Sequence, residues 1–190
     1  IIGRIEHYIS RKAMDIDGLG GETVALLFQN NLVKDYSDLY ELKIEQIIPL
    51  ERMAQKSAEN IINGVEKSKQ IPFERVLYAI GIRYVGETVA KKLAKHYKSI
   101  EALQRATLLD LILVDEIGER IAQSVVAFFE NRENIQIINR LKDFGVQMEI
   151  VEKINPNATA ILEGKTFVVS GVFSLFSREE LKQSIEDNGG

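Results

Sequence analysis

The chain has 190 residues, of which 45% are hydrophobic and 27% charged, a composition typical of a folded globular protein with one or two domains. The absence of cysteine excludes disulfides and thiolate metal sites and favours a reducing compartment, so we expect a cytoplasmic protein. No apolar run approaches the roughly 18 residues that a membrane helix needs, and no signal peptide is recognisable. The first residue is not Met and helical spacing begins at once, so we expect part of a longer protein.

The net charge of −4 is unevenly distributed along the chain. Residues 51–100 hold ten Lys and Arg against five Asp and Glu, a balance of +5, which leaves −9 on the remainder. Such a basic segment is compatible with a contact to an anionic polymer and equally with a solvated helix face. Charge alone leaves both interpretations open.

The first predicted element is an amphipathic helix, written IEHYISRKAM over residues 5–14. It leads into a glycine-rich segment, residues 16–20 (IDGLG), which a second helix follows. The same five-residue frame recurs at spacings of 34, 32 and 32. We call the four copies the first to fourth hairpin segments: residues 16–20 (IDGLG), 50–54 (LERMA), 82–86 (IRYVG) and 114–118 (VDEIG).

Each hairpin segment carries the same pattern of apolar and small residues. Its first and fourth positions are apolar and are expected to anchor the turn to the core. One face of the following helix carries a small or apolar residue four places after the segment and another apolar residue seven places after it. These residues are Val24 and Leu27, Ala58 and Ile61, Ala90 and Leu93, and Ala122 and Val125. We expect the final Gly of a segment to adopt unusual backbone angles and to leave the nearby N–H groups uncovered.

The second and fourth hairpin segments share a similar lead-in, SDLYELKIEQIIPLERMA and SIEALQRATLLDLILVDEIG. Both predict a short helix capped by Ser37 or Ser99, then a second helix, then the hairpin. The first and third segments lack this lead-in. The pattern therefore predicts a mainly α fold with four tandem helix-hairpin-helix units in two similar halves, covering roughly residues 4–145.

A hairpin that leads into a helix presents unpaired N–H groups and the positive end of the helix dipole, an arrangement that binds phosphate. Cofactor loops match poorly. A dinucleotide fingerprint needs a preceding strand and a third Gly, where the first segment has a helix and Thr23. A P-loop at Gly164-Lys165-Thr166 would need Gly where Thr159 stands. We therefore exclude both kinds of nucleotide loop.

Candidate catalytic and metal-binding residues are scattered. Asp and Glu lie on predicted helix surfaces without a convergent set, so we expect no catalytic residues here. His7 and His96 are 89 positions apart, form no ligand pattern and are expected to be structural or on the surface, so no metal site is predicted.

Four spaced phosphate cradles suit a polymer whose phosphates repeat better than a single cofactor. Backbone N–H donors carry no sequence information, so the predicted DNA binding is not sequence-specific. Some hairpins are alternatively plain turns, above all the Gly-free second one. Tyr84 is expected to pack beneath its hairpin, and Glu87, Glu116 and Glu119 weaken the local positive charge. The candidate DNA-binding residues are Gly18, Gly20, Gly86 and Gly118 through their amides, Thr23 and Thr88, and the cations Arg52, Lys56, Arg83, Lys91 and Arg120.

The ordered series HYISRKAMDIDGLGGETVALLFQNNLVKDYSDLYEL, LERMAQKSAENIINGVEKSK and LYAIGIRYVGETVAKKLAKHY resembles the helix-hairpin-helix domain of bacterial NAD-dependent DNA ligases over residues 1–150. The resemblance implies a parent enzyme that seals nicked duplex DNA in replication and repair, with NAD, magnesium and zinc as its cofactors. It also implies that this part grips the duplex from the minor-groove side, beside other domains of a monomeric ligase.

The adenylated Lys of that family lies in a Lys-x-Asp-Gly motif that this chain lacks. Lys142-Asp143-Phe144-Gly145 has the wrong spacing. The family's four-Cys zinc module, which precedes the first helix, is not in this sequence either. We therefore expect this part to bind none of the three cofactors and to have no ligase activity alone.

Residues 151–163 have the composition of a linker. The following GKTFVVSGVF predicts a buried strand, and FSREELKQSIEDNGG predicts a helix with a Ser177/Glu180 capping box and Gly189 after its end. Residues 164–190 thus resemble the first strand and helix of a BRCT domain, an incomplete α/β unit. The resemblance implies a phosphate contact at Ser170 and Gly171, which we do not expect the incomplete unit to retain.

Two other functions stay open at the level of the sequence. Tandem helix-hairpin-helix units also occur in DNA-junction and repair proteins. Degenerate copies of the motif serve as helical arrays that bind other proteins.

Overall fold

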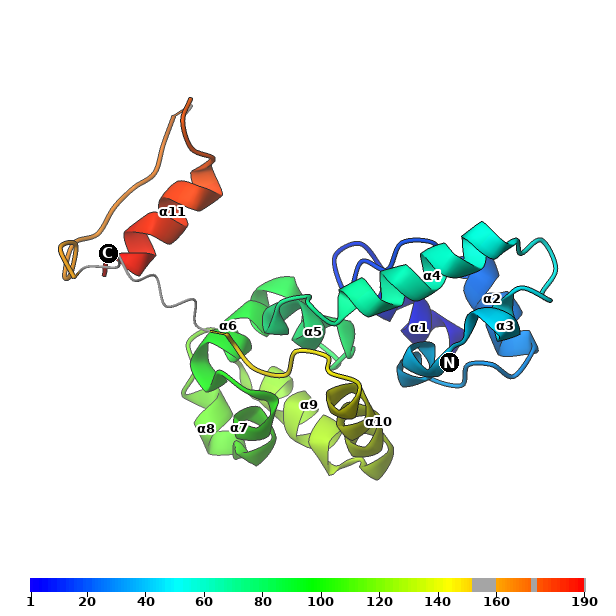
Figure 1. Ribbon diagram of the computed structural model, residues 1–190. Coiled ribbons are helices and arrows are strands. Elements are labelled where there is room, and N and C mark those ends of the chain that lie inside the picture. The colour runs from blue at the N-terminus through cyan, green and yellow to red at the C-terminus, as the bar shows by residue number, and fades with distance from the viewer. Residues whose placement is uncertain (152–159, 172–173, 190) are drawn as a thin grey trace. The chain divides into compact units, whose positions relative to one another are not determined.

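The computed structural model describes residues 1–151, 160–171 and 174–189, and the chain divides into two compact units, Ile1–Ile150 and Val151–Gly190. The first unit is built from helices (Figure 1). Across the described residues no strand is formed, and an isolated antiparallel bridge pairs Ser99 with Glu149. The mainly helical fold predicted from the sequence is confirmed for this unit.

The helices of the first unit follow one another with short connections. In chain order they are α1 (Ile2–Ile9), α2 (Gly21–Gln29), the 3-10 helix η1 (Tyr36–Glu41), α3 (Ile44–Ile47), α4 (Gln55–Ser68), α5 (Phe73–Ala79), α6 (Glu87–Tyr97), α7 (Ile100–Arg105), α8 (Leu108–Ile112), α9 (Glu119–Glu130) and α10 (Arg132–Asp143). The second unit contributes α11 (Arg178–Asp187).

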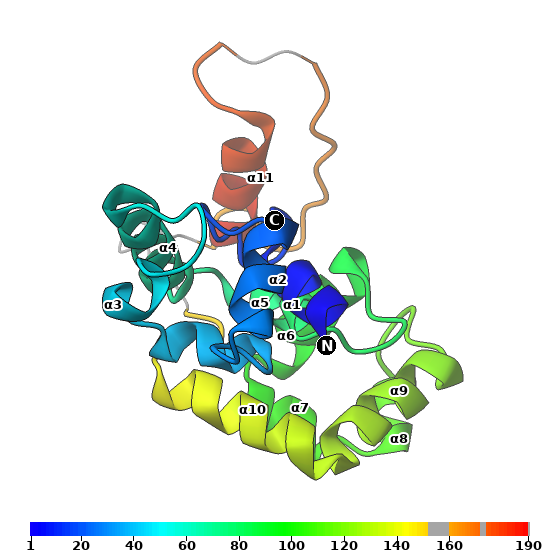
Figure 2. The same cartoon turned by 90° about the vertical axis from the view of Figure 1, so that its right-hand side faces the viewer.

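Each hairpin segment joins two helices that pack against each other. The pairs are α1 with α2, α3 with α4, α5 with α6, and α8 with α9 (Figure 2). The second helix of each pair begins directly after its hairpin segment, at residue 21, 55, 87 or 119. The register of the four predicted frames therefore matches the observed helix starts.

The core uses the apolar positions that the repeat places on one face of each second helix. Ala58, Ala90 and Ala122 are completely buried, and their small side chains allow the preceding helix to approach closely. Three positions further on, Ile61, Leu93 and Val125 are also buried. Burial of each larger side chain contributes about 1.5–3 kcal/mol relative to exposure, so these positions account for much of the packing between paired helices.

The lead-ins of the second and fourth hairpins have related structures with one difference in capping. Ser99 caps α7 as predicted, because its hydroxyl accepts a hydrogen bond from the Ala102 N–H at 3.2 Å. In the first half the predicted cap at Ser37 is wrong. Asp35 caps a 3-10 helix there, and its carboxylate accepts the Ser37 N–H at 2.7 Å. A carboxylate two residues earlier thus takes the role predicted for the Ser37 hydroxyl.

The first hairpin packs closely on α4. A Cβ on Gly64 would lie 2.6 Å from the Asp17 carbonyl oxygen, so only glycine allows this approach of hairpin and helix. Gly18 has φ +83°, and a Cβ there would lie 3.3 Å from the Ile61 nitrogen. The first two hairpins are therefore joined into one structural half through backbone contact.

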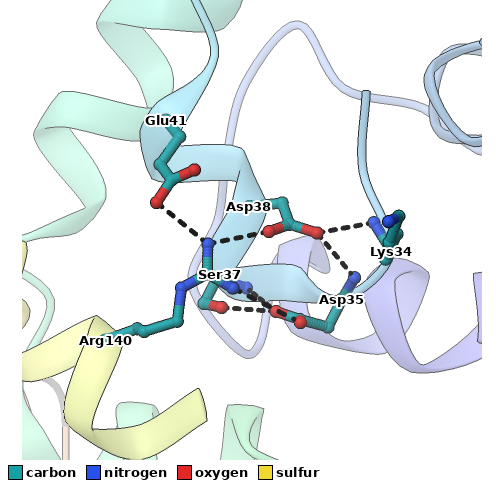
Figure 3. A network of polar contacts seen from close by, with 6 residues as sticks. All are labelled: Lys34, Asp35, Ser37, Asp38, Glu41 and Arg140. Carbon is teal, nitrogen blue, oxygen red and sulfur yellow. Dashed lines mark hydrogen bonds and ion pairs between the residues drawn. The ribbon is translucent and has the colours of Figure 1, made fainter. Parts of the chain in front are cut away.

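Arg140 links the two halves of the first unit. Its guanidinium contacts three carboxylates of the η1 region, Asp38 at 2.8 Å, Glu41 at 3.1 Å and Asp35 at 3.5 Å (Figure 3). Burial tends to raise the pKa of Asp38, but hydrogen bonds from the Lys34 backbone and from Arg140 lower it below its ordinary value. The Arg140 side chain is 33% exposed, so solvent screens part of the attraction.

The second unit contains the predicted helix, but its described residues do not form the predicted strand. Ser177 and Glu180 form the expected capping box on α11, and Gly189 follows with φ +89°. Residues 165–171 form no strand, and Val168 is 90% exposed. A strand needs a hydrogen-bonding neighbour, and the described residues provide none. Residues 172–173 and most of the predicted linker, 152–159, lie outside the described residues.

Two helical glycines should respond in opposite ways to alanine. Gly64→Ala places a methyl group against the Asp17 carbonyl and should lower the free energy of unfolding by about 1–3 kcal/mol. Gly3→Ala meets no atom within 4 Å and should raise it by about 0.5 kcal/mol, because alanine favours helix. Urea denaturation followed by circular dichroism measures both. Equal effects of the two substitutions would contradict the packing of the first hairpin on α4.

The link made by Arg140 should also be visible in stability. Arg140→Ala should lower the free energy of unfolding by about 1–2 kcal/mol at pH 7, because three carboxylates lose a partner. Lys142 lies on the same helix as Arg140 and makes an exposed ion pair with Glu101 of α7. Lys142→Ala therefore serves as the control and should have little effect. A loss no greater for Arg140→Ala than for the control would contradict the link.

The pH dependence follows from the lowered pKa of Asp38. A carboxyl whose pKa is lower in the folded state contributes stability that is fully present above its unfolded value of about 4. That contribution is lost as the pH falls from there through the folded value. The acid loss of stability should therefore be shallower in Arg140→Ala than in the unmodified chain, as urea titrations between pH 7 and pH 2.5 would measure. Superimposable pH profiles would argue against the pairing.

Candidate nucleic-acid interface

All four hairpin segments turn at their third residue. That residue has a positive φ in every copy: +83° at Gly18, +61° at Arg52, +65° at Tyr84 and +63° at Glu116. The sequence-based expectation of unusual angles at the fifth residue is wrong. Gly20, Ala54, Gly86 and Gly118 are extended, with φ between −75° and −114°. They are extended because each is the N-cap residue of the helix that follows.

The four helices that follow the hairpins lack side-chain caps. No side chain accepts from the first-turn N–H groups of α2, α4, α6 or α9. By contrast, Asp35, Ser99, Thr107, Asn131 and Ser177 cap η1, α7, α8, α10 and α11. The starts of α1, α3 and α5 also lack a side-chain cap, so uncapped starts are common to the four hairpin helices without being confined to them. Unpaired donors and the positive end of a helix dipole are thus present after every hairpin segment.

Three of these helix starts also have open space in front of them. A Cβ on Gly20, Gly86 or Gly118 would meet no atom within 4 Å. Neither the backbone angles nor the packing at these positions therefore requires glycine. The absence of a side chain leaves the approach to the backbone amides open. At Gly86 and Gly118 an anion could therefore reach the amides without displacing a side chain. At the start of α2 the Glu6 carboxylate lies close to Gly21, where a Cβ would be 2.7 Å from Glu6 Oε1.

Of the predicted hydroxyl donors, Thr88 is exposed at the second residue of α6 and Thr23 is half-buried at the third residue of α2. The predicted cations Arg52, Lys56, Arg83, Lys91 and Arg120 are all exposed. Each lies within a hairpin segment or in the first two turns of the following helix.

Two of the three glutamates that weaken the predicted positive charge have lysine partners. Lys12 pairs with Glu87 at 3.0 Å, and Lys92 pairs with Glu116. Glu119 accepts a hydrogen bond from Gln123. Among the residues that the structure describes, Arg83 and Arg120 have no carboxylate partner. The glutamates therefore neutralise less of the positive charge of Arg83 and Arg120, beside the third and fourth hairpins, than the sequence indicates.

Tyr84 does not pack beneath its hairpin, contrary to the sequence-based expectation. Its side chain is 39% exposed. The Cζ atoms of Arg83 and Arg120 lie 4.9 Å and 4.2 Å from the ring centroid, and the Arg120 guanidinium donates to the Tyr84 hydroxyl at 2.7 Å. Because Arg120 lies in the first turn of α9, this contact brings the third and fourth hairpins side by side.

Sequence reasoning missed Lys12, which lies 75 positions from its partner Glu87. It belongs to the turn between α1 and the first hairpin, and Arg75 fixes that turn by donating to the carbonyl oxygens of Arg11 at 2.6 Å and Lys12 at 3.3 Å. The basic run Arg11-Lys12 before the first hairpin was the available signal. Only the fold shows that it lies near the start of α6.

The predicted residues Ser170 and Gly171 belong to the second unit, where both are exposed. Gly171 has φ +103°, and its carbonyl oxygen lies 3.5 Å from an Arg178 nitrogen. Among the described residues of the second unit, no contact distinguishes them as an anion site.

The remaining polar features are structural. His7 Nε2 donates a hydrogen bond to the Tyr78 carbonyl oxygen at 2.9 Å, as expected for a structural histidine. It lines a cavity of about 290 Å³ together with Gly3, Arg4 and residues 79–82 and 85.

No cluster of three or more potential metal ligands occurs within the described residues. None of the described helices is long and apolar enough to cross a membrane.

The chain is similar to known proteins both in a short motif and over its whole length. The family model described as "Helix-hairpin-helix motif" matches residues 75–138, which include the third and fourth hairpins. Over its full length the chain is 76% identical to the DNA ligase of Flavobacterium johnsoniae, 68% to that of Flavobacterium psychrophilum and 66% to that of Christiangramia forsetii. It covers only 28%, 28% and 29% of these relatives. The chain is therefore highly similar to these DNA ligases over all of its own residues, but it spans less than a third of their length.

Proposed function

We propose that the chain is the duplex-binding part of a bacterial NAD-dependent DNA ligase that seals nicks in replication and repair. The identity of 76% to a DNA ligase over all 190 residues supports this assignment, as does the helix-hairpin-helix match. The single observation that carries it is the series of uncapped helix starts after the hairpins, α2, α4, α6 and α9. A nick-sealing enzyme needs such a grip, because it must hold DNA whatever the sequence around the nick.

The hairpins act as four tandem helix-hairpin-helix units in two halves. Their first-turn amides donate hydrogen bonds to phosphate oxygens, with the helix dipole adding to the attraction. Phosphate contacts position a protein on the duplex without reading bases, so binding is independent of sequence. We propose that the chain lies on the minor-groove side of the duplex, across the nick, as the resemblance to NAD-dependent DNA ligases implies.

Exposed cations add a salt-dependent attraction. Arg52, Lys56, Arg83, Lys91 and Arg120 lie beside the proposed amide contacts. Each phosphate that they neutralise releases counterions, and the logarithm of the affinity falls by about 0.9 per phosphate for each tenfold rise in salt. This explains how a chain with a net charge of −4 can bind DNA.

The chemical steps of the parent enzyme belong to other segments. This sequence has no Lys-x-Asp-Gly motif, and we assign to it neither adenylation nor the binding of NAD, magnesium or zinc. Its partners are nicked duplex DNA and the other domains of the same cytoplasmic, monomeric ligase. In the incomplete BRCT-like unit, residues 164–190, we assign no phosphate contact to Ser170 or Gly171.

The other functions are less well supported. A junction or repair module would explain the hairpins but not the full-length similarity to DNA ligases. A protein-binding helical array would not require open space in front of Gly20, Gly86 and Gly118. The second hairpin, where Ala54 replaces glycine, is the weakest of the four proposed contacts.

Aspartate at a hairpin glycine should separate DNA binding from stability. In Gly86→Asp or Gly118→Asp the new carboxylate can cap the helix, so the free energy of unfolding should stay constant or rise by about 1 kcal/mol. The same carboxylate occupies the amides and repels phosphate. The affinity for a fluorescent nicked duplex should fall about tenfold or more at fixed salt, measured by anisotropy.

Ser177→Asp is the matched control, because it adds one negative charge at an N-cap that already has a side-chain cap. It should bind DNA like the unmodified chain. Unchanged affinity of Gly118→Asp would contradict the phosphate contact at the fourth hairpin. An equal loss in Ser177→Asp would mean that net charge, rather than a local contact, sets the affinity.

A further inference from the structure

Tyr84 and two arginines form a compact surface cluster between the third and fourth hairpins. The ring of Tyr84 has Arg83 Cζ at 4.9 Å and Arg120 Cζ at 4.2 Å from its centroid. The phenol oxygen accepts a hydrogen bond from Arg120 Nη2 at 2.7 Å. We call these three residues the Tyr84 cluster. It brings two like charges to one exposed aromatic ring, an arrangement that favours an anionic ligand.

The surrounding charges do not neutralise this cluster. Glu87 and Glu116 are engaged by Lys12 and Lys92, and Glu119 by Gln123. Within the described part of the chain, no carboxylate pairs with either arginine of the cluster. A guanidinium that stacks on a ring uses its face and keeps its in-plane N–H groups for phosphate oxygens. Arg120 gives one such group to Tyr84 and retains the others.

The first half of the unit has no equivalent cluster. Gly18 occupies the third position of its hairpin, where the third hairpin has Tyr84. Lys56 occupies the second position of α4, where α9 has Arg120. Lys56 has no aromatic ring at this place and, among described residues, no ion pair. The two halves therefore share a backbone pattern but differ in their side chains at the same repeat positions.

We propose that Tyr84 is a positioning residue that holds Arg83 and Arg120 as one phosphate-binding cluster, and that this cluster makes the third and fourth hairpins the main anchor on DNA. The proposal rests on the DNA-binding function proposed above and assigns unequal roles to its two halves. The second half holds the backbone phosphates tightly, and the first half adds a weaker grip further along the duplex.

The test compares Arg120→Ala with Lys56→Ala, which are matched by repeat position, on the complete 190-residue chain. The probe is a fluorescent nicked duplex of 24 base pairs, titrated at several KCl concentrations. Arg120→Ala should lower the affinity by about tenfold and make the salt dependence shallower by about one phosphate contact. Lys56→Ala should lower it by about threefold or less.

The role of Tyr84 is tested by Tyr84→Gly and Tyr84→Phe. Glycine suits the positive φ of this residue, so Tyr84→Gly should keep or raise the melting temperature while it lowers the affinity as much as Arg120→Ala does. The double variant with Arg120→Ala should bind no more weakly than either single variant, because both remove the same cluster. Tyr84→Phe keeps the ring and loses the phenol oxygen, and its affinity should be intermediate.

The outcomes separate the two proposals. If the unmodified chain does not bind duplex DNA, the proposed function fails and this inference fails with it. If the chain binds but Arg120→Ala and Lys56→Ala weaken binding equally, the main-anchor assignment is wrong. If the fold losses of affinity of Tyr84→Gly and Arg120→Ala multiply in the double variant, Tyr84 does not position the arginines. The same conclusion follows if Tyr84→Gly binds DNA as tightly as the unmodified chain. In every case after the first the DNA-binding function stands.

Discussion

The residue with positive φ in the middle of each hairpin sets where the next helix begins. Only Gly18 adopts this conformation without cost, whereas Arg52, Tyr84 and Glu116 each require about 1–2 kcal/mol. Apolar residues at the first and fourth positions offset that cost, and they are buried in the third and fourth hairpins but only partly buried at Leu50 and Met53 of the second. In the third hairpin Ile82 and Val85 are 3% and 6% exposed, and such burial contributes about 1.5–3 kcal/mol per side chain. In the third hairpin the anchors therefore outweigh the strain, and the turn holds an uncapped helix start at the surface.

The position of the hairpins relative to one another depends on contacts between distant parts of the first unit. Within the first half, Gly64 lets α4 approach the Asp17 backbone. Between the halves, α10 contacts the first half through Arg140 and through Asn134, which accepts from Arg4 at 3.3 Å. A protein that binds a polymer needs donors at fixed spacings, so we expect these contacts to matter for the proposed DNA binding.

Much of this architecture could be predicted from local patterns. The four frames located the hairpins and the helix starts, because apolar spacing and helix capping act over a few residues. The prediction of unusual backbone angles at the fifth-position glycine was wrong, because periodicity does not reveal which residue of a five-residue turn reverses the chain. The position of Tyr84, the pairing of Lys12 with Glu87 and the link from Arg140 depend on residues 36 to 105 positions apart. The strand predicted near Val168 failed because a strand also needs a neighbour.

The central claim is that uncapped helix starts bind the DNA backbone. Amide chemical shifts of the isotope-labelled chain, followed by NMR during titration with a nicked duplex, test it most directly. The largest changes should fall on residues 21–23, 87–89 and 119–121, in the first turns of α2, α6 and α9. The capped starts of α7 and α8 should change little. Changes concentrated on the capped helices, or on α10, would contradict the account.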